Sequence, residues 1–235
     1  MGQKKLVRFA ELLTFKNVLQ FPENMPGKWK DFFENKNPIV LELACGKGEY
    51  TVGLAEMYPD KNFLGIDIKG NRLWVGARKA IQKQLSNVGF LRAQIDGINN
   101  YFAPVEVSEI WITFPDPQLR MSKAKKRLTH PKFLREYHKI LTPGGIIHLK
   151  TDSPDLYQFT KMILEMSGAN ILVDYDDVYK ESTLDEELKI KTHYEQLDIA
   201  QSNRVHYISF TLPEVFPGKE LDEKVKNVLK DAAAD

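Results

Sequence analysis

"VLELACGKGEYTVGLA", residues 40–55, joins an apolar run to a glycine-containing turn and then to a helical pattern. A turn of this kind brings backbone N–H groups close to a ligand at the N-terminus of a helix. The loop Ala44-Cys45-Gly46-Lys47-Gly48 lacks the G-x-G-x-x-G spacing of a dinucleotide site. Glu42, at the end of the predicted strand, would repel a pyrophosphate and attract a cation. The stretch therefore predicts a site for a positively charged cofactor.

Short apolar runs alternate with helical patterns along the rest of the chain. They are rich in Ile, Leu and Val and are bounded by Gly, Pro or Asp, which is typical of a parallel sheet buried on both faces. The alternation predicts an α/β fold with a doubly wound, Rossmann-like, mostly parallel seven-stranded sheet. A closing antiparallel strand is expected at residues 204–212, which alternate and follow a long acidic connection. The other predicted strands are residues 38–43, 62–68, 88–93, 107–113, 145–151 and 170–175.

Composition limits the class of protein. The 235 residues are 43% hydrophobic and 28% charged, so the chain can bury a full core as one domain. We expect an N-terminal extension over residues 1–37, the main domain over 38–212 and a tail over 213–235. The net charge of +1 excludes a uniformly basic nucleic-acid binder. A single cysteine, Cys45, excludes an internal disulfide, and the five histidines lack metal-site spacing, so no metal is expected.

Neither a signal peptide nor an apolar stretch of membrane-spanning length is visible in the sequence. We therefore expect a cytoplasmic protein with no membrane partner. No pattern indicates whether the chain is a monomer or a homodimer.

Two further acids follow predicted strands. Asp67 ends the second one, where an acid suits ribose hydroxyl groups, and Asp96 follows the third, where it can accept from an adenine amino group. S-adenosylmethionine carries an ammonium, a sulfonium, a ribose and an adenine. Glu42, Gly46, Gly48, Asp67 and Asp96 together therefore predict an S-adenosylmethionine-dependent methyltransferase, although each alone is equally compatible with a turn or a cap.

The segment "FPDPQLRMSKAKKRL", residues 114–128, follows the fourth predicted strand. Pro115 and Pro117 stiffen the backbone around Asp116. Its place at the strand end predicts that this carboxylate faces the transferred methyl group. The bases after it suit RNA phosphates next to the target, and they are Arg120, Lys123, Lys125, Lys126 and Arg127.

"FPDP" with its basic tail, the "TD" of Thr151-Asp152 and the "THYE" of residues 192–195 together resemble the bacterial tRNA (guanine-N7-)-methyltransferases. "LELACGKGEY" and "FLGIDIKGNR" are similar to the cofactor segments of that family, and the resemblance runs from about Pro38 to Phe210. The chain departs from the family at Gln118, where a Trp is usual.

The resemblance implies roles for particular residues. It implies cofactor contacts for Glu42, Asp67, Asp96 and Asp116, and Asp116 takes the position usually called catalytic. The substrate contacts that it implies are Arg120, Asp152, Thr192, His193, Tyr194 and Glu195. The expected partner is tRNA, with guanine 46 of the variable loop as target and 7-methylguanosine as product.

The chemistry is consistent with this set of residues. Guanine N7 carries a lone pair and no proton, so methyl transfer needs no general base and no metal. The site must align the base and stabilise the arriving positive charge, and carboxylates at Asp116, Asp152 or Glu195 suit both tasks. Two alternatives remain open: a methyltransferase of the same fold acting on another RNA, a protein or a small molecule, and a catalytically silent RNA-binding protein on this scaffold.

Overall fold

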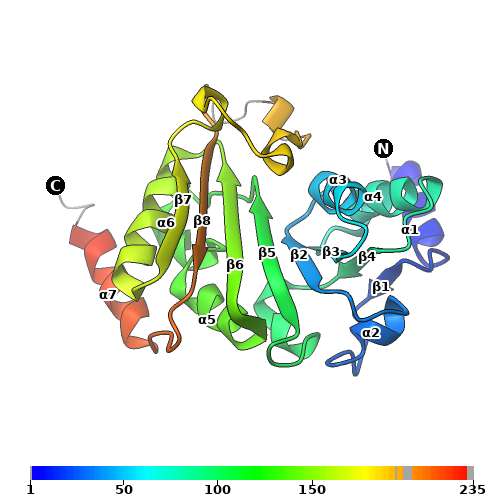
Figure 1. The fold of residues 1–235 in the computed structure, drawn as a ribbon, viewed down its shortest axis with the longest axis horizontal. Coiled ribbons are helices and arrows are strands. Elements are labelled where there is room, and N and C mark those ends of the chain that lie inside the picture. The colour runs from blue at the N-terminus through cyan, green and yellow to red at the C-terminus, as the bar shows by residue number, and fades with distance from the viewer. Residues whose placement is uncertain (1, 194, 198–202, 232–235) are drawn as a thin grey trace.

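A computed structural model describes residues 2–193, 195–197 and 203–231. Its centre is an eight-stranded sheet in the order β1-β4-β3-β2-β5-β6-β8-β7 (Figure 1). The strands are β1 (Val18–Gln20), β2 (Ile39–Leu43), β3 (Asn62–Asp67), β4 (Val88–Arg92), β5 (Val107–Thr113), β6 (Leu141–Thr151), β7 (Asn170–Tyr175) and β8 (His206–Thr211). β8 runs antiparallel to both β6 and β7, whereas the other pairs are parallel. The predicted α/β class and the antiparallel closing strand are confirmed.

Helices cover the sheet on both faces. The α-helices are α1 (Gly2–Leu12), α2 (Trp29–Phe32), α3 (Glu49–Met57), α4 (Gly70–Gln82), α5 (Pro131–Ile140), α6 (Pro154–Ser167) and α7 (Glu220–Asp231). Short 3-10 helices are η1 (Ile95–Asn100), η2 (Met121–Lys126), η3 (Val178–Lys180), η4 (Glu186–Lys189) and η5 (Glu195–Leu197). Figure 1 shows α6 and α7 at one end of the sheet and α1 at the other.

Alternation along the strands divides the core into two clusters. In β2, Leu41 and Leu43 pack with residues of α5 and α6, whereas Val40 packs with residues of α3 and α4. Neighbouring side chains of a strand point to opposite faces of the sheet, so each strand contributes to both clusters. All five residues of β2 are buried, which explains why the central strands lack a polar face in the sequence.

The N-terminal segment contributes more to the sheet than predicted. Val18–Gln20 form β1, which pairs in parallel with β4 and makes the eighth strand. Trp29 is fully buried, stacks on Phe102 at a centroid distance of 5.2 Å and donates from Nε1 to the carbonyl oxygen of Tyr101 at 2.8 Å. The segment before β2 is therefore anchored to the main sheet.

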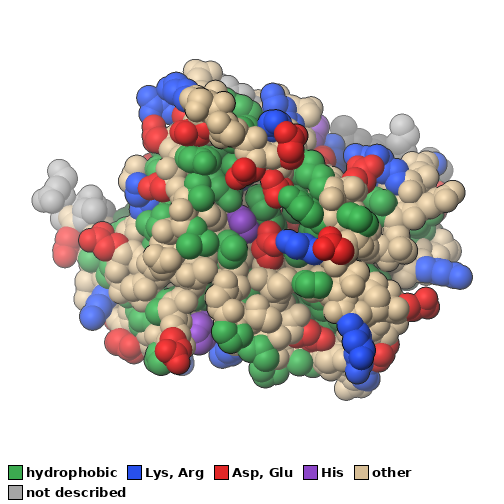
Figure 2. Space-filling view, viewed as in Figure 1, with side chains coloured by type: hydrophobic (Ala, Val, Ile, Leu, Met, Phe, Trp, Pro, Cys, Tyr) green, Lys and Arg blue, Asp and Glu red, His purple; other side chains and the backbone are tan. Residues whose placement is uncertain are grey.

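The C-terminal segment forms a helix with one buried side. Leu221 and Val225 of α7 are 2% and 0% exposed, and α7 contacts α5 and α6. Within the predicted tail, residues 220–231 are helical. On the face of the molecule shown in Figure 2, acidic and basic side chains are intermixed, in agreement with the net charge of +1. In the described part of the chain no helix has the length and apolar character to cross a membrane.

Candidate active site

The glycine loop lies between β2 and α3, beside the point where the strand order reverses between β2 and β5. Three of its residues have positive φ: Ala44 at 55°, Gly46 at 57° and Gly48 at 69°. A Cβ atom on Gly48 would also come within 2.6 Å of the Phe90 ring. Conformation and space therefore both require glycine at 48, whereas Ala44 costs about 1–2 kcal/mol in its left-handed conformation. The backbone of this loop is held tightly against the sheet.

Asp67, at the end of β3, accepts hydrogen bonds from both the glycine loop and the residues before α4. Its Oδ2 accepts from the backbone N–H of Gly46 at 3.0 Å, and its Oδ1 accepts from the N–H of Lys69 at 2.7 Å. The residue is only 7% exposed, yet it lines the cleft described below. Its carboxylate therefore joins the glycine loop to the start of α4 and presents acceptor oxygens at the carboxyl edge of the sheet.

Glu42 lies between β2 and the first turns of α3 and is 3% exposed. Its carboxylate accepts from the Thr51 N–H at 2.7 Å, from the Thr51 hydroxyl and from the Thr113 hydroxyl at 2.9 Å. Burial raises the pKa of Glu42 to about 7, and these hydrogen bonds only partly oppose the rise. A cation nearby would favour the ionised form, but Glu42 lies beneath the glycine loop and lines neither cavity of the cleft described below.

Two adjoining cavities form one cleft at the carboxyl edge of the sheet. Their volumes are about 750 and 560 Å³, and both are lined by Ala44, Asp67 and Ile68. The first also contains Asp116 and Asp152, and the second contains Asp96. The fold thus brings four of the predicted acids to one cleft from four strand ends. Ligands of open α/β sheets bind at this edge, beside the switch in strand order.

The turn that carries Asp116 has an unusual backbone. Phe114 and Gln118, on either side of Pro-Asp-Pro, have φ values of 46° and 48°. The Oδ1 atom of Asp116 accepts from the N–H of Gln118 at 3.0 Å, which closes a small turn. Non-glycine residues in this conformation cost of the order of 1–3 kcal/mol each and often mark functional sites. The strained turn holds an exposed carboxylate at the mouth of the cleft.

Arg127 supports this turn, and its predicted contact with RNA phosphate does not match its position. The residue is 4% exposed, and its guanidinium lies 4.4 Å from the centroid of the Phe159 ring. Its Nε donates to the carbonyl oxygen of Pro117 at 3.2 Å, and its Nη2 donates to that of Gln118 at 3.3 Å. Burial lowers the pKa of Arg127. Because Arg127 is buried and its Nε and Nη2 donate to carbonyl oxygens of the Asp116 turn, it positions this turn and does not face an external phosphate.

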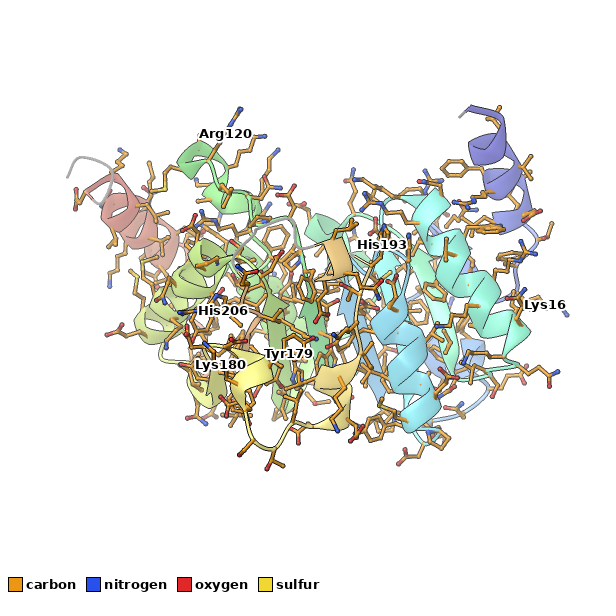
Figure 3. All side chains as sticks on the ribbon, turned by 90° about the horizontal axis from the view of Figure 1, so that it is seen from above. Lys16, Arg120, Tyr179, Lys180, His193 and His206 are labelled. Carbon is orange, nitrogen blue, oxygen red and sulfur yellow. The ribbon has the colours of Figure 1, made fainter. Side chains whose placement is uncertain are left out.

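The other basic residues of the segment 114–128 are exposed. Arg120, Lys123, Lys125 and Lys126 lie on and just before η2, and all four side chains are exposed. Figure 3 shows Arg120 pointing away from the body of the molecule. Lys125 and Lys126 also line the second cavity of the cleft, next to Asp96. The basic segment therefore lies beside the cleft, as its position in the sequence predicted.

Asp96 forms an exposed ion pair with Lys132 at this same cavity. Its side chain is 59% exposed and that of Lys132 is 46% exposed. An exposed pair contributes little to stability and is easily exchanged for another partner. Asp96 therefore remains accessible at the far end of the cleft from Asp152.

The "THYE" segment contains a capping box that the sequence analysis did not recognise. The Glu195 N–H donates to Thr192 Oγ1 at 3.1 Å, and the Thr192 N–H donates to Glu195 Oε2 at 3.3 Å. The T-x-x-E spacing is a known signal for this reciprocal arrangement. His193 lies between them and is half-buried (Figure 3), whereas Tyr194 lies outside the described residues.

The buried Lys150 forms an ion pair with Glu195 of this capping box. The ammonium of Lys150, at the end of β6, is fully buried and lies 3.2 Å from Glu195 Oε2. It also donates to the carbonyl oxygens of Leu188 at 2.9 Å and Ile190 at 3.1 Å, and the hydroxyl of Tyr179 donates to Glu195. Burial lowers the pKa of Lys150, and Glu195 opposes that shift. The oxygens of Glu195 are thus already paired with Lys150 and Tyr179, and the predicted contact of Glu195 with a guanine edge stays a prediction.

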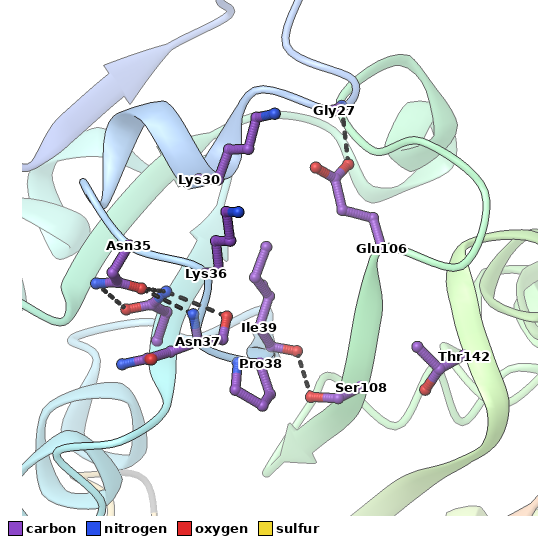
Figure 4. A pocket seen from close by; sticks show the side chains of 11 residues that line it. Gly27, Lys30, Asn35, Lys36, Asn37, Pro38, Ile39, Glu106, Ser108 and Thr142 are labelled. Carbon is purple, nitrogen blue, oxygen red and sulfur yellow. Dashed lines mark hydrogen bonds between the residues drawn. The ribbon is translucent and has the colours of Figure 1, made fainter.

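Another cavity, of about 420 Å³, lies at the opposite, amino edge of the sheet (Figure 4). Several of its polar groups are paired with each other: Asn35 with Asn62, Ser108 with the Ile39 carbonyl, and the Glu106 carboxylate with the N–H of Gly27. It contains none of the predicted site residues, so the carboxyl-edge cleft is the candidate active site.

Comparison with known proteins agrees with this geometry. A family model described as a putative methyltransferase matches residues 36–208. The tRNA (guanine-N(7)-)-methyltransferase of Bacteroides fragilis is 46% identical over 96% of this chain and 92% of its own length. The protein of the same name from Porphyromonas gingivalis is 50% identical over 86% of each chain. This chain belongs to the tRNA (guanine-N7-)-methyltransferase family.

Solved structures support the fold assignment for this family member. The 16S rRNA methyltransferase KamB superposes with a TM-score of 0.61 over 84% of this chain and 99% of its own, at 13% identity. A structure titled as an antibiotic-related methyltransferase has a TM-score of 0.59 over 79% of this chain and 93% of its own, at 16% identity. At these identities the likeness concerns the fold, which is that of the class I methyltransferases.

Proposed function

We propose that this protein transfers the methyl group of S-adenosylmethionine to N7 of a guanine in tRNA, with guanine 46 of the variable loop as target and 7-methylguanosine as product. The observation that carries the proposal is the cleft itself. Asp67 and the glycine loop adjoin one wall, Asp116 and Asp152 line the same cavity, and an exposed basic segment follows Asp116. The names of the relatives point to the same reaction.

The residues that line the cleft, together with the buried Glu42 and the glycine loop beside it, fit the proposed cofactor. Glu42 is a buried carboxyl group whose raised pKa a cation would lower again, which suits the ammonium of the methionine part. Asp67 offers carboxylate oxygens for ribose hydroxyls, and Asp96, in the adjoining cavity, suits the adenine. Gly46 and Gly48 keep the loop close to this space. When bound, the cofactor supplies the electrophilic methyl group.

The protein's own residues have to orient the base. Guanine N1–H and the exocyclic amino group are donors, and we infer that Asp152 and Asp116 accept from them and thereby turn N7 towards the cofactor. Their negative charge also stabilises the positive charge that the purine acquires. No proton has to be removed from N7, so neither carboxylate needs to act as a base. Arg120, Lys123, Lys125 and Lys126 bind flanking phosphates in this arrangement.

Methyl transfer from labelled S-adenosylmethionine to unmodified tRNA transcripts, followed by mapping of the labelled base, tests the proposal. Label at N7 of a variable-loop guanine is expected. Label on another base would replace the target by a different RNA site. Cofactor and tRNA binding without any transfer would favour a silent RNA-binding protein.

The role of Asp116 has its own test. Asp116→Asn keeps an oxygen for the Gln118 N–H and removes the charge. Loss of one preorganised electrostatic group typically slows catalysis by about 10²–10³-fold, so we expect a decrease of that order with tRNA binding nearly intact. Asp60→Asn, at an exposed position outside the cleft, is the matched control. Unchanged turnover of the Asp116 variant would refute this assignment of the active centre.

A further inference from the structure

A separate cavity of about 320 Å³ lies between the basic helix η2 and the C-terminal helix α7. In Figure 3 these two helices lie next to each other, with Arg120 at the η2 end. The cavity is lined by Met121, Ser122, Ala124, Lys125, His130, Val225, Lys226, Leu229 and Lys230. None of the residues assigned above to the cofactor or the guanine lines this cavity. Lys125, which was assigned to a flanking phosphate, lines it.

The chemistry of this cavity is that of apolar walls with a basic rim. Met121 and Leu229 supply apolar surface, whereas Lys125, Lys226 and Lys230 supply three positive charges and no lining residue is acidic. Lys226 lies 3.1 Å from a carboxylate oxygen of Glu223, but the two side chains are 46% and 63% exposed. An exposed pair of this kind is weak and exchanges readily, so Lys226 remains available to an anion.

His130 adds a neutral polar group to the same wall. Its Nδ1 accepts from the N–H of Lys132 at 3.1 Å, so a neutral ring carries its proton on Nε2. Burial lowers the pKa of His130 to about 4, which keeps the ring neutral at physiological pH. The lining therefore combines apolar contact and cationic groups and contains no carboxylate, which suits a base with its phosphates and does not suit a metal ion.

The cavity adjoins the active-site cleft. Lys125 lines both this cavity and the Asp96 side of the cleft. Leu119 lines the Asp116 side, and Met121, two residues further along, lines the α7 cavity. Two residues of extended chain span at most about 7 Å, so Leu119 and Met121 place the walls of the two cavities close together.

We propose that the cavity between η2 and α7 binds an unpaired nucleotide of the RNA substrate close to the target guanine, with the base against Met121 and Leu229 and the adjoining phosphates on Lys226 and Lys230. The inference rests on the proposed function, because it takes tRNA as the ligand. It gives α7, whose position in the chain is far from the predicted site residues, a direct role in substrate binding.

Binding of unmodified tRNA transcript by the Lys226→Gln/Lys230→Gln variant, measured by fluorescence anisotropy at a series of salt concentrations, tests the phosphate contacts. Each lost contact on single-stranded nucleic acid lowers the log–log salt slope by about 0.7, so two lower it by about 1.4. If the two binding curves meet near 1 M salt, this corresponds to roughly 25-fold weaker binding at about 0.1 M. Calorimetric binding of S-adenosylmethionine to the variant checks that it is folded.

Lys219→Gln/Lys224→Gln is the matched control, because it removes the same number of charges from exposed positions just before and on α7 that do not line the cavity. We expect wild-type binding and slope for this control. Equal losses for the control and the Lys226→Gln/Lys230→Gln variant would overturn the proposal, since they would show a general effect of charge. Wild-type binding by the Lys226→Gln/Lys230→Gln variant would overturn it as well and would assign this surface to another partner.

The base contact is tested with tRNAs that lack single bases near the target. One such abasic position is expected to weaken binding by wild-type protein and to have no further effect on the Met121→Ala variant. If no abasic position weakens wild-type binding, the cavity holds no base and the proposal fails. Base mapping with wild-type protein judges the proposed methylation separately, since these measurements follow binding alone.

Discussion

The buried carboxyl group of Glu42 predicts a particular dependence of stability on pH. In the folded chain its pKa is about 7, against an ordinary value of 4.5. The folded state thus binds this proton more tightly than the unfolded state. The resulting stabilisation is fully present below pH 4.5 and is lost as the pH rises through 7, because the ionised group is then buried. A shift of this size corresponds to about 3 kcal/mol in total.

Glu42→Gln isolates this effect, since the amide has nearly the same shape and does not titrate. The difference in unfolding free energy, wild type minus variant, should fall by roughly 2–3 kcal/mol between about pH 5 and pH 8. Urea denaturation at each pH measures it. The lowered pKa of His130 acts in the opposite direction, with stability lost as the pH falls from 6.5 through about 4, but it is common to both proteins and cancels. A difference that stays constant with pH would refute the reasoning.

Three other substitutions test the contacts that hold the site. Lys150→Met leaves the buried carboxylate of Glu195 without its cation and should lower the free energy of unfolding by about 3–5 kcal/mol. Adding Glu195→Gln to the same chain should restore part of this loss. Additive losses in a double-mutant cycle measured by urea denaturation would contradict the pairing. Arg127→Lys keeps the charge but loses the planar guanidinium that donates to two carbonyl oxygens. Methyl transfer should therefore slow at least tenfold (about 1.4 kcal/mol), while the affinity for the cofactor, measured by calorimetry, is kept. A wild-type rate would exclude the positioning role. Gly76→Ala would place a Cβ atom 2.6 Å from the carbonyl oxygen of Lys47 and displace the glycine loop. The affinity for S-adenosylmethionine should therefore fall by roughly tenfold or more. An unchanged affinity with an intact circular dichroism spectrum would show that the loop adapts.

The strand pattern was predictable because it depends on local chemistry. Buried parallel strands require continuous apolar runs, and the predicted runs 38–43, 62–68 and 107–113 correspond to β2, β3 and β5. The short edge strand Val18–Gln20 was missed. Three residues at an edge carry no periodicity of their own, and their pairing with β4 depends on a neighbour some seventy positions away.

The acids of the site were found in the sequence because strand ends of a parallel sheet meet at one edge. Asp67, Asp96, Asp116 and Asp152 do line one cleft. Their contacts with cofactor and guanine remain predictions. Tyr194 is outside the described residues, so its predicted role is likewise open.

The sequence alone determined the class of fold, the edge of the sheet that carries the site and the family, because each depends on short-range periodicity, on turn residues or on motif order. Only the tertiary structure decided which polar groups are already satisfied. Arg127 belongs to a run of bases and Glu195 to the "THYE" segment, yet one is buried under the Asp116 turn and the other is paired with Lys150. The physical reason is that burial and pairing depend on residues far apart in the chain, whose distances no local pattern contains.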